Sequence, residues 1–121
     1  NAGTSATGEF ESALDATWQA DFDLKLFAAI RLARLAIPEM KKRNWGRIIN
    51  VTNIGAKQPA AKSMPTTVTR AAGLALTKAL SKEFAPNNIL VNSICNQFNK
   101  CLKQTFKTFN EVVVGHGNRR L

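Results

Sequence analysis

The chain has 121 residues, of which 45% are hydrophobic and 7% aromatic, a composition that supports one domain with a modest core and argues against general disorder. No apolar run approaches the roughly 18–20 residues that a membrane-spanning helix needs, so we expect no membrane span. The 17 Lys and Arg residues exceed the 8 Asp and Glu residues and give a net charge of +9.

The charge is unevenly distributed along the chain. Residues 1–24 contain five acids and no base, whereas residues 25–121 contain 17 bases and three acids. Such asymmetry can indicate a nucleic-acid or membrane-surface partner. The densest cluster, Lys41-Lys42-Arg43, stands where a helix is expected to end and where cations offset the helix dipole. Because the scattered bases lack interleaved aromatic residues and a recognisable binding motif, nucleic-acid binding is the disfavoured interpretation.

The chain contains two cysteines, Cys95 and Cys101, and one histidine, His116. These three side chains do not make up the four ligands of a structural zinc site, so no metal site is predicted. We interpret Cys95 as a buried, inert thiol, and a disulfide to Cys101 is the alternative. The cysteine usage fits a reducing compartment, which predicts a cytoplasmic location. His116 is interpreted as part of a polar tail.

Residues 1–44 predict a loop followed by one long helix. Residues 1–8 are small and polar, and a helix is expected from Asp15 or Thr17, either of which suits an N-cap, to about residue 43. Pro38 is expected to kink its last turn. One apolar stripe follows the helical spacing: Trp18, Phe22, Leu26, Ala29, Ala33, Ile37 and Met40. Further apolar residues make this surface wider than one stripe: Leu24, Phe27, Ile30, Leu32 and Leu35. The helix therefore needs a second covering partner.

A strand–helix–strand pattern follows, which is typical of a parallel sheet. Residues 47–52 predict a short strand covered on both faces, and residues 54–65 predict a loop. A helix is expected from Thr66 or Thr67 to about Phe84, and residues 89–95 predict a second buried strand. Five apolar residues of this helix are available for burial: Ala71, Leu74, Ala75, Leu80 and Phe84. Beyond residue 95 the sequence predicts a marginal helix with Phe98, Leu102, Phe106 and Phe109 on one side, then a β-prone VVV and a basic tail.

Several segments, in order and correctly spaced, resemble the short-chain dehydrogenase/reductase family over roughly residues 1–95. Asn1-Ala2-Gly3 is similar to the family's NAG segment, residues 18–40 to its W…PxM helix, residues 46–51 to its GRIINV strand, and residues 71–92 to the segment after the active-site Lys. The resemblance implies a Rossmann-like three-layer α/β/α fold with a parallel sheet, of which residues 1–95 hold the second half. Residues 96–121 form a divergent basic C-terminal segment.

The resemblance also places four family site positions on this sequence. The family's Asn, which anchors a proton-relay water, falls at Lys25, and the Ser that orients the carbonyl falls at Asn53. The Tyr that transfers the proton falls at Thr66, and the Lys that lowers the pKa of that Tyr and holds the nicotinamide ribose falls at Arg70. An aliphatic hydroxyl is a far weaker acid than a phenol, and a guanidinium does not release its proton at ordinary pH.

Two of these positions keep a possible role by the same resemblance. Asn53 can still donate a hydrogen bond to a carbonyl oxygen, and Arg70 can still bind ribose hydroxyls. If cofactor is supplied, Lys25 beside Arg70 is a candidate proton donor, because burial and like charge favour the neutral amine. The alternative is that Lys25 is solvated or paired with a carboxylate.

The implied cofactor is NAD or NADP, with Asn1, Ala2 and Gly3 beside the adenine ribose and Arg70 at the nicotinamide ribose. The glycine-rich turn that holds the pyrophosphate in the family has no counterpart in this sequence, which weakens the expectation of binding. The sequence therefore predicts an oxidoreductase homologue that is impaired or inactive. The alternative is a non-enzymatic, truncated or degenerate relative that acts as an oligomerisation or interaction module. Under both interpretations we expect a homo-oligomer through the helices at about residues 17–43 and 66–84, because the matching helices form a dimer interface in the family.

Overall fold

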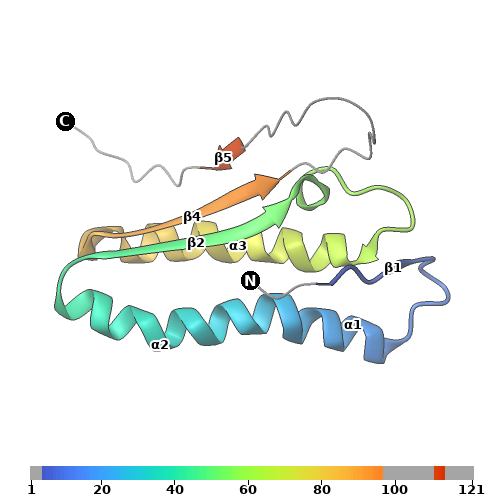
Figure 1. The fold of residues 1–121 in the computed structure, drawn as a ribbon, viewed down its shortest axis with the longest axis horizontal. Coiled ribbons are helices and arrows are strands. Elements are labelled where there is room, and N and C mark those ends of the chain that lie inside the picture. Colours follow the sequence, from blue (N-terminus) through green and yellow to red (C-terminus); the bar gives the residue numbers. More distant parts are fainter. Residues whose placement is uncertain (1–3, 97–110, 114–121) are drawn as a thin grey trace.

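The computed structural model describes residues 4–96 and 111–113. Two parallel strands, β2 (Gly46–Asn53) and β4 (Ile89–Asn96), form the centre of the fold. The helices α2 (Ala28–Lys42) and α3 (Thr66–Phe84) pack together against the same face of these strands (Figure 1). The strand–helix–strand unit predicted for residues 46–95 is confirmed, with β2 two residues and β4 one residue longer than expected.

The long N-terminal helix is built from three consecutive parts. They are α1 (Asp15–Phe22), a π-helical turn η1 (Asp23–Phe27) and α2. The predicted start at Asp15 is confirmed, but the N-cap is Leu14 and no side chain caps this end. Pro38 lies inside α2, and the helix ends after Lys42, two residues before Asn44 adopts a left-handed φ of 49°. No helix among residues 4–96 is long and apolar enough to cross a bilayer.

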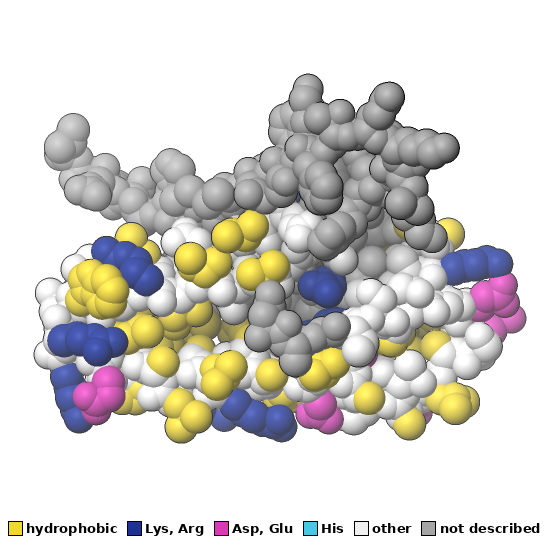
Figure 2. Space-filling model, viewed as in Figure 1, with side chains coloured by type: hydrophobic (Ala, Val, Ile, Leu, Met, Phe, Trp, Pro, Cys, Tyr) yellow, Lys and Arg dark blue, Asp and Glu magenta, His cyan; other side chains and the backbone are white. Residues whose placement is uncertain are grey.

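The predicted apolar stripe of this helix faces the core. Ala33 and Ile37 of α2 are buried together with Ile89 and Val91 of β4, and partly buried side chains from β2, α2 and α3 pack around them. The additional apolar residues lie on the outer surface of the same helix, where Leu32 is 67% and Leu35 77% exposed. Figure 2 shows hydrophobic side chains interspersed with charged ones along this lower side of the molecule.

The two strands run in register, from Gly46 beside Ile89 to Asn53 beside Asn96. A third strand, β5 (Glu111–Val113), pairs antiparallel with the other edge of β4 and includes part of the β-prone VVV segment. The marginal helix predicted between β4 and β5, and the basic tail, lie outside the described residues. Cover on both faces was expected, but Ile49 and Val51 of β2 are 59% and 45% exposed.

The side chains that α3 buries differ from those predicted. Ala71 and Ala75 are exposed, and the helix instead buries hydroxyl side chains: Thr66, Thr67, Thr69, Thr77 and Ser81. Thr69 and Thr77 each donate a hydrogen bond to the backbone carbonyl four residues earlier, at 3.2 and 2.8 Å. Because the Thr69 and Thr77 hydroxyls donate to backbone carbonyls one turn earlier, their burial leaves neither donor unsatisfied.

Two segments that were predicted as loop form short strands that pair with each other. The strands β1 (Thr7–Gly8) and β3 (Met64–Pro65) pair antiparallel, and a 3₁₀ turn, η2 (Ile54–Ala56), follows β2. A second 3₁₀ turn, η3 (Ala85–Asn87), joins α3 to β4. Such two-residue strands arise from a long-range contact and have no local periodicity, so the sequence contains no signal for them.

The start of β2 requires a glycine for close packing. A Cβ at Gly46 would lie 2.5 Å from Met40 Sδ, 2.8 Å from its Cγ and 2.9 Å from its Cβ. We expect Gly46→Ala to lower the free energy of unfolding by about 1–3 kcal/mol, because the Met40 Cβ cannot move without its backbone. Urea denaturation measures this. Gly73→Ala is the control: a Cβ there meets nothing within 4 Å, and we expect a gain of about 0.5–1 kcal/mol from helix propensity.

Candidate active site

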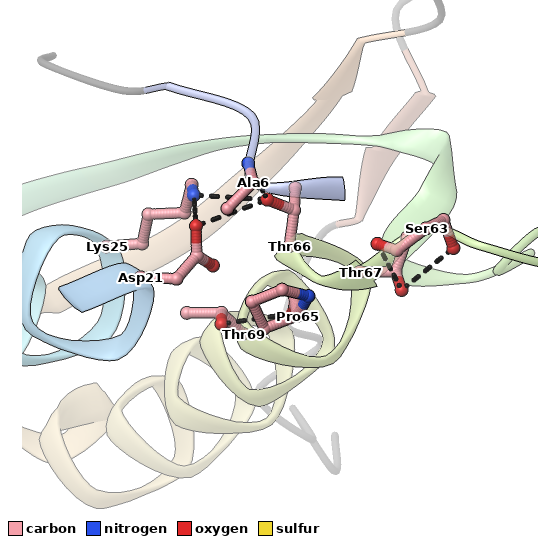
Figure 3. Close-up of polar contacts among 8 residues, drawn as sticks. All are labelled: Ala6, Asp21, Lys25, Ser63, Pro65, Thr66, Thr67 and Thr69. Carbon is pink, nitrogen blue, oxygen red and sulfur yellow. Dashed lines mark hydrogen bonds and ion pairs between the residues drawn. The ribbon is translucent and has the colours of Figure 1, made fainter. Parts of the chain in front are cut away.

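Two of the predicted site residues meet where the N-terminal helix passes the start of α3. Lys25 lies in the π-helical turn η1, and Thr66 is the first residue of α3. A π-helical turn within an α-helix is often found at a functional site. Figure 3 shows both side chains pointing toward Asp21, which lies in the last turn of α1.

A buried ion pair forms the centre of this cluster. Lys25 Nζ forms a salt bridge with Asp21 Oδ1, and the two side chains are only 9% and 1% exposed. The residues are four apart, so their side chains lie on the same face of the helix. The second carboxylate oxygen, Asp21 Oδ2, is buried and accepts no hydrogen bond from the described residues. Of the two roles open to Lys25, the structure shows pairing with a carboxylate.

The Thr66 hydroxyl completes the cluster. Its Oγ1 lies 3.3 Å from Lys25 Nζ and 3.2 Å from Asp21 Oδ1, and accepts a hydrogen bond from the backbone N–H of Ala6 at 2.9 Å. The Thr66 N–H in turn donates to the Ala6 carbonyl at 3.3 Å. One donor and two acceptor positions are all that a hydroxyl offers. With Thr66 only 2% exposed, its oxygen has neither a free position nor access for a further partner.

The other two predicted site residues stand apart from this cluster. Asn53 is the last residue of β2, and its Oδ1 is buried without a hydrogen-bond partner among the described residues. Arg70 lies one turn beyond Thr66 on α3, and its Nε is also buried without a partner. Neither makes a hydrogen bond to Lys25 or Thr66 in the described structure. Buried polar atoms without a partner are uncommon, and each is expected to have a cause such as an ordered water or a ligand group.

The remaining predicted positions, Asn1, Ala2 and Gly3, lie outside the described residues. Asp21 was not identified as a site residue from the sequence. The available signal was its spacing of four from Lys25, which places an acid and a base together on the apolar side of a helix. The role of the Ala6 N–H had no signal at all, because it comes from the β1–β3 pairing.

The fold defines a class of protein: a Rossmann-type α/β chain in which helices pack against a pair of parallel strands joined by a helix. The family model described as short chain dehydrogenase matches residues 1–105. The chain is 36% identical over 88 residues to human "Dehydrogenase/reductase SDR family member 4", covering 70% of this chain and 32% of that one. It is 34% identical over 97 residues to the monensin polyketide synthase putative ketoacyl reductase of Streptomyces virginiae, covering 78% and 37%.

A solved structure agrees with these sequence matches. L-Sorbose reductase from Gluconobacter frateurii, in complex with NADPH and L-sorbose, superposes with a TM-score of 0.75 at 39% identity, over 78% of this chain and 36% of that one. The chain therefore belongs to the short-chain dehydrogenase/reductase family of oxidoreductases. It spans about a third of the length of the curated relatives it matches.

Proposed function

We propose that this chain is a short-chain oxidoreductase homologue in which the positions for proton transfer have become structural, so that carbonyl reduction is lost or strongly impaired. The observation that carries the proposal is the buried Asp21–Lys25–Thr66 cluster. The position that the resemblance assigns to the family's acidic Tyr holds a hydroxyl that is 2% exposed and fully hydrogen-bonded.

Each group in the cluster is unsuited to proton transfer with a substrate. Thr66 is an aliphatic alcohol and a very weak acid compared with a phenol. The Lys25 ammonium is engaged by Asp21 Oδ1 in a buried salt bridge, so it is directed at that carboxylate and not at a substrate. A general acid must also come within hydrogen-bond reach of the substrate, whereas these side chains are nearly fully enclosed. The geometry therefore supports a role in holding α1, η1 and α3 together.

The residues fit one end of a nicotinamide cofactor. The unpartnered Arg70 Nε can donate to a ribose hydroxyl, and Asn53 can bind an amide or carbonyl group. The cofactor supplies hydride to a carbonyl carbon in the family. The sequence contains no glycine-rich turn for the pyrophosphate, where backbone N–H groups and a helix N-terminus normally supply most of the binding. We therefore expect the chain by itself to bind NADH and NADPH too weakly for saturation.

Titration with NADPH, followed by nicotinamide fluorescence, tests this expectation. We expect no saturation up to millimolar cofactor and no difference between the unchanged chain and Arg70→Met. Saturable binding at micromolar concentration that Arg70→Met abolishes would contradict the loss of cofactor binding. The same titration with NADH covers the second cofactor. Circular dichroism spectra of both proteins check that the substitution leaves the fold intact.

Self-association is a second candidate function, and the exposed helix surface favours it. Leu32 and Leu35 lie on the outer side of α2 with 67% and 77% of their surface exposed, and Phe27 is 38% exposed. Large exposed apolar side chains on one helix are typical of an interaction surface. We propose that two copies of the chain associate through this surface and the exposed side of α3.

Light scattering after size-exclusion chromatography tests the association. We expect a dimer whose dissociation constant rises at least about tenfold on Leu35→Lys, because a charge enters the apolar contact. Leu14→Lys is the matched control, since Leu14 is 71% exposed but precedes α1. A monomer for the unchanged chain, or an equal effect of the two substitutions, would rule out this surface.

A further inference from the structure

The end of the molecule where α2 stops and β2 begins carries cations around an exposed aromatic ring. This basic end consists of five exposed residues: Lys41, Lys42, Arg43, Trp45 and Arg47. Trp45, its aromatic member, is 50% exposed. Figure 2 shows dark blue side chains next to hydrophobic ones at this end, on the left of the view. The structure therefore brings basic and aromatic side chains together at one end of the fold.

Two guanidinium groups of the basic end are held in place by the ring and by backbone carbonyls. Arg43 Cζ lies 5.9 Å and Arg47 Cζ 5.1 Å from the centre of the Trp45 ring. Arg43 Nε donates to the Trp45 carbonyl at 3.3 Å, and Arg47 Nη1 donates to the carbonyls of Gly46 and Asn88 at 2.6 and 3.0 Å. Each guanidinium keeps further N–H donors for an anion. Because both groups are already ordered, they lose less entropy on binding one.

The backbone that carries Trp45 is fixed by contacts between two turns. Asn44 and Asn88 both adopt a left-handed φ, of 49° and 54°, a conformation in which Asn is enriched. Asn88 Nδ2 donates to the Asn44 carbonyl at 3.1 Å, and the Trp45 N–H donates to the Met40 carbonyl at 3.1 Å. The turn after α2 is thus tied to the turn before β4, and it presents the indole in a defined position.

The protein itself neutralises only part of the charge at the basic end. Lys42 Nζ pairs with Glu39 Oε1 at 2.6 Å. Lys41, Arg43 and Arg47 form no salt bridge with the residues that the structure describes. The C-terminus of α2 contributes a partial negative charge equivalent to about half an elementary charge. Three unpaired cations exceed this charge, so the basic end remains positive and complements an anionic partner.

We propose that the basic end binds the surface of a membrane that contains anionic lipids, with the Trp45 indole at the level of the headgroups. Tryptophan is enriched at the membrane–water interface, because its ring is apolar and its N–H finds a polar partner there. Neighbouring Lys and Arg residues are attracted to the anionic headgroups. The inference goes beyond the proposed function, since none of these residues belongs to the candidate active site.

The geometry of the ring favours a lipid surface over a nucleic acid. Both partners offer phosphate groups to the guanidinium donors. Proteins that bind single-stranded nucleic acids also stack the bases on aromatic side chains. Here the guanidinium groups of Arg43 and Arg47 already lie over the Trp45 ring and compete with a stacked base. Contact with headgroups requires no stacking on the ring.

Binding to lipid vesicles tests the proposal. The chain is prepared with Trp18→Phe, so that Trp45 is its only tryptophan. We expect this protein to bind vesicles of phosphatidylcholine and phosphatidylserine at least about tenfold more tightly than vesicles of phosphatidylcholine alone, and to bind less tightly as salt is added. The Trp45 emission is expected to shift to shorter wavelength on binding, because the indole leaves water.

A pair of matched double variants locates the binding surface. Arg43→Gln with Arg47→Gln is expected to weaken vesicle binding at least about tenfold, since each basic residue near an anionic surface contributes about a factor of five. Arg31→Gln with Arg34→Gln is the control, because it removes the same charge from exposed positions of α2. Both variants keep the bases beyond residue 96, and circular dichroism confirms that both are folded.

Three outcomes would overturn the proposal. The first is equal binding to the two kinds of vesicle, or to neither, and the second is an equal effect of the two double variants. The third is tighter binding to a labelled oligothymidylate than to the anionic vesicles at the same salt concentration, which would assign the basic end to a nucleic acid. None of these measurements involves cofactor or turnover, so a failure here is distinguishable from a failure of the proposed loss of catalysis.

Discussion

Replacing Lys25 with Met is expected to lower the free energy of unfolding by about 3–5 kcal/mol, because it leaves Asp21 as an uncompensated charge in the interior. Asp21 is 3% exposed and its Oδ2 already lacks a hydrogen bond. After the substitution, only the Thr66 hydroxyl remains to stabilise the carboxylate. Urea denaturation at neutral pH measures the change, which is a large share of the about 5–15 kcal/mol that typically stabilises a domain.

The double variant Asp21→Leu, Lys25→Met separates charge from packing. Replacing both members of a buried ion pair with apolar residues of similar volume is often neutral or stabilising by about 1–4 kcal/mol, so we expect most of the lost stability to return. Lys42→Met is the control, because its ion pair with Glu39 is exposed and contributes about 0–1 kcal/mol. A small, equal effect of Lys25→Met and Lys42→Met would show that the buried pair does not stabilise the fold.

Placing Tyr at position 66, where the resemblance assigns the family's proton-transferring Tyr, is expected to destabilise the chain without producing carbonyl reduction. The Thr66 side chain is enclosed at 2% exposure, so a phenol ring has no space, and overpacking costs about 1–3 kcal/mol. The change also removes the acceptor for the Ala6 N–H and the donor to Asp21, at about 1–3 kcal/mol for each buried group left unpaired. We therefore expect a total loss of about 3 kcal/mol or more from the combined terms.

Two smaller substitutions at Thr66 distinguish size from hydrogen bonding. Thr66→Ser keeps the hydroxyl and is expected to retain most of the stability, whereas Thr66→Val keeps the shape and loses about 1–3 kcal/mol for each of the two groups left unpaired, the Ala6 N–H and the Asp21 carboxylate. Thermal and urea denaturation measure all three variants, and NADPH oxidation measures activity. A Thr66→Tyr protein that is as stable as the unchanged chain and reduces carbonyl compounds would contradict the structural role of this position.

The central architecture was predictable because its signals are local. Residues 47–52 and 89–95 are apolar runs of strand length, and the helix beginning at Thr66 has strong helix formers and a stop at Pro86-Asn87. These features do not depend on contacts with distant parts of the chain. The buried side of the N-terminal helix, with Ala33 and Ile37 at its centre, likewise followed from a spacing of three and four residues.

The site was harder to predict because its contacts join distant segments. Position 66 could be placed by resemblance, but its hydrogen bond to the Ala6 N–H depends on the β1–β3 pairing. The burial of Thr69 and Thr77 contradicted a rule based on hydrophobicity, since each hydroxyl is satisfied within its own helix. Asp21 had the right spacing from Lys25, but spacing alone does not show that a pair is buried rather than exposed.

The rate of NADPH-dependent reduction, measured with purified chain and a panel of small ketones and diketones, tests whether the Asp21–Lys25–Thr66 cluster is structural. We expect no NADPH oxidation above the rate without protein, for the unchanged chain and for Lys25→Met assayed at a temperature where both are folded. Turnover by the unchanged chain that disappears in the folded Lys25→Met protein would contradict it, because Lys25 would then transfer a proton instead of holding Asp21.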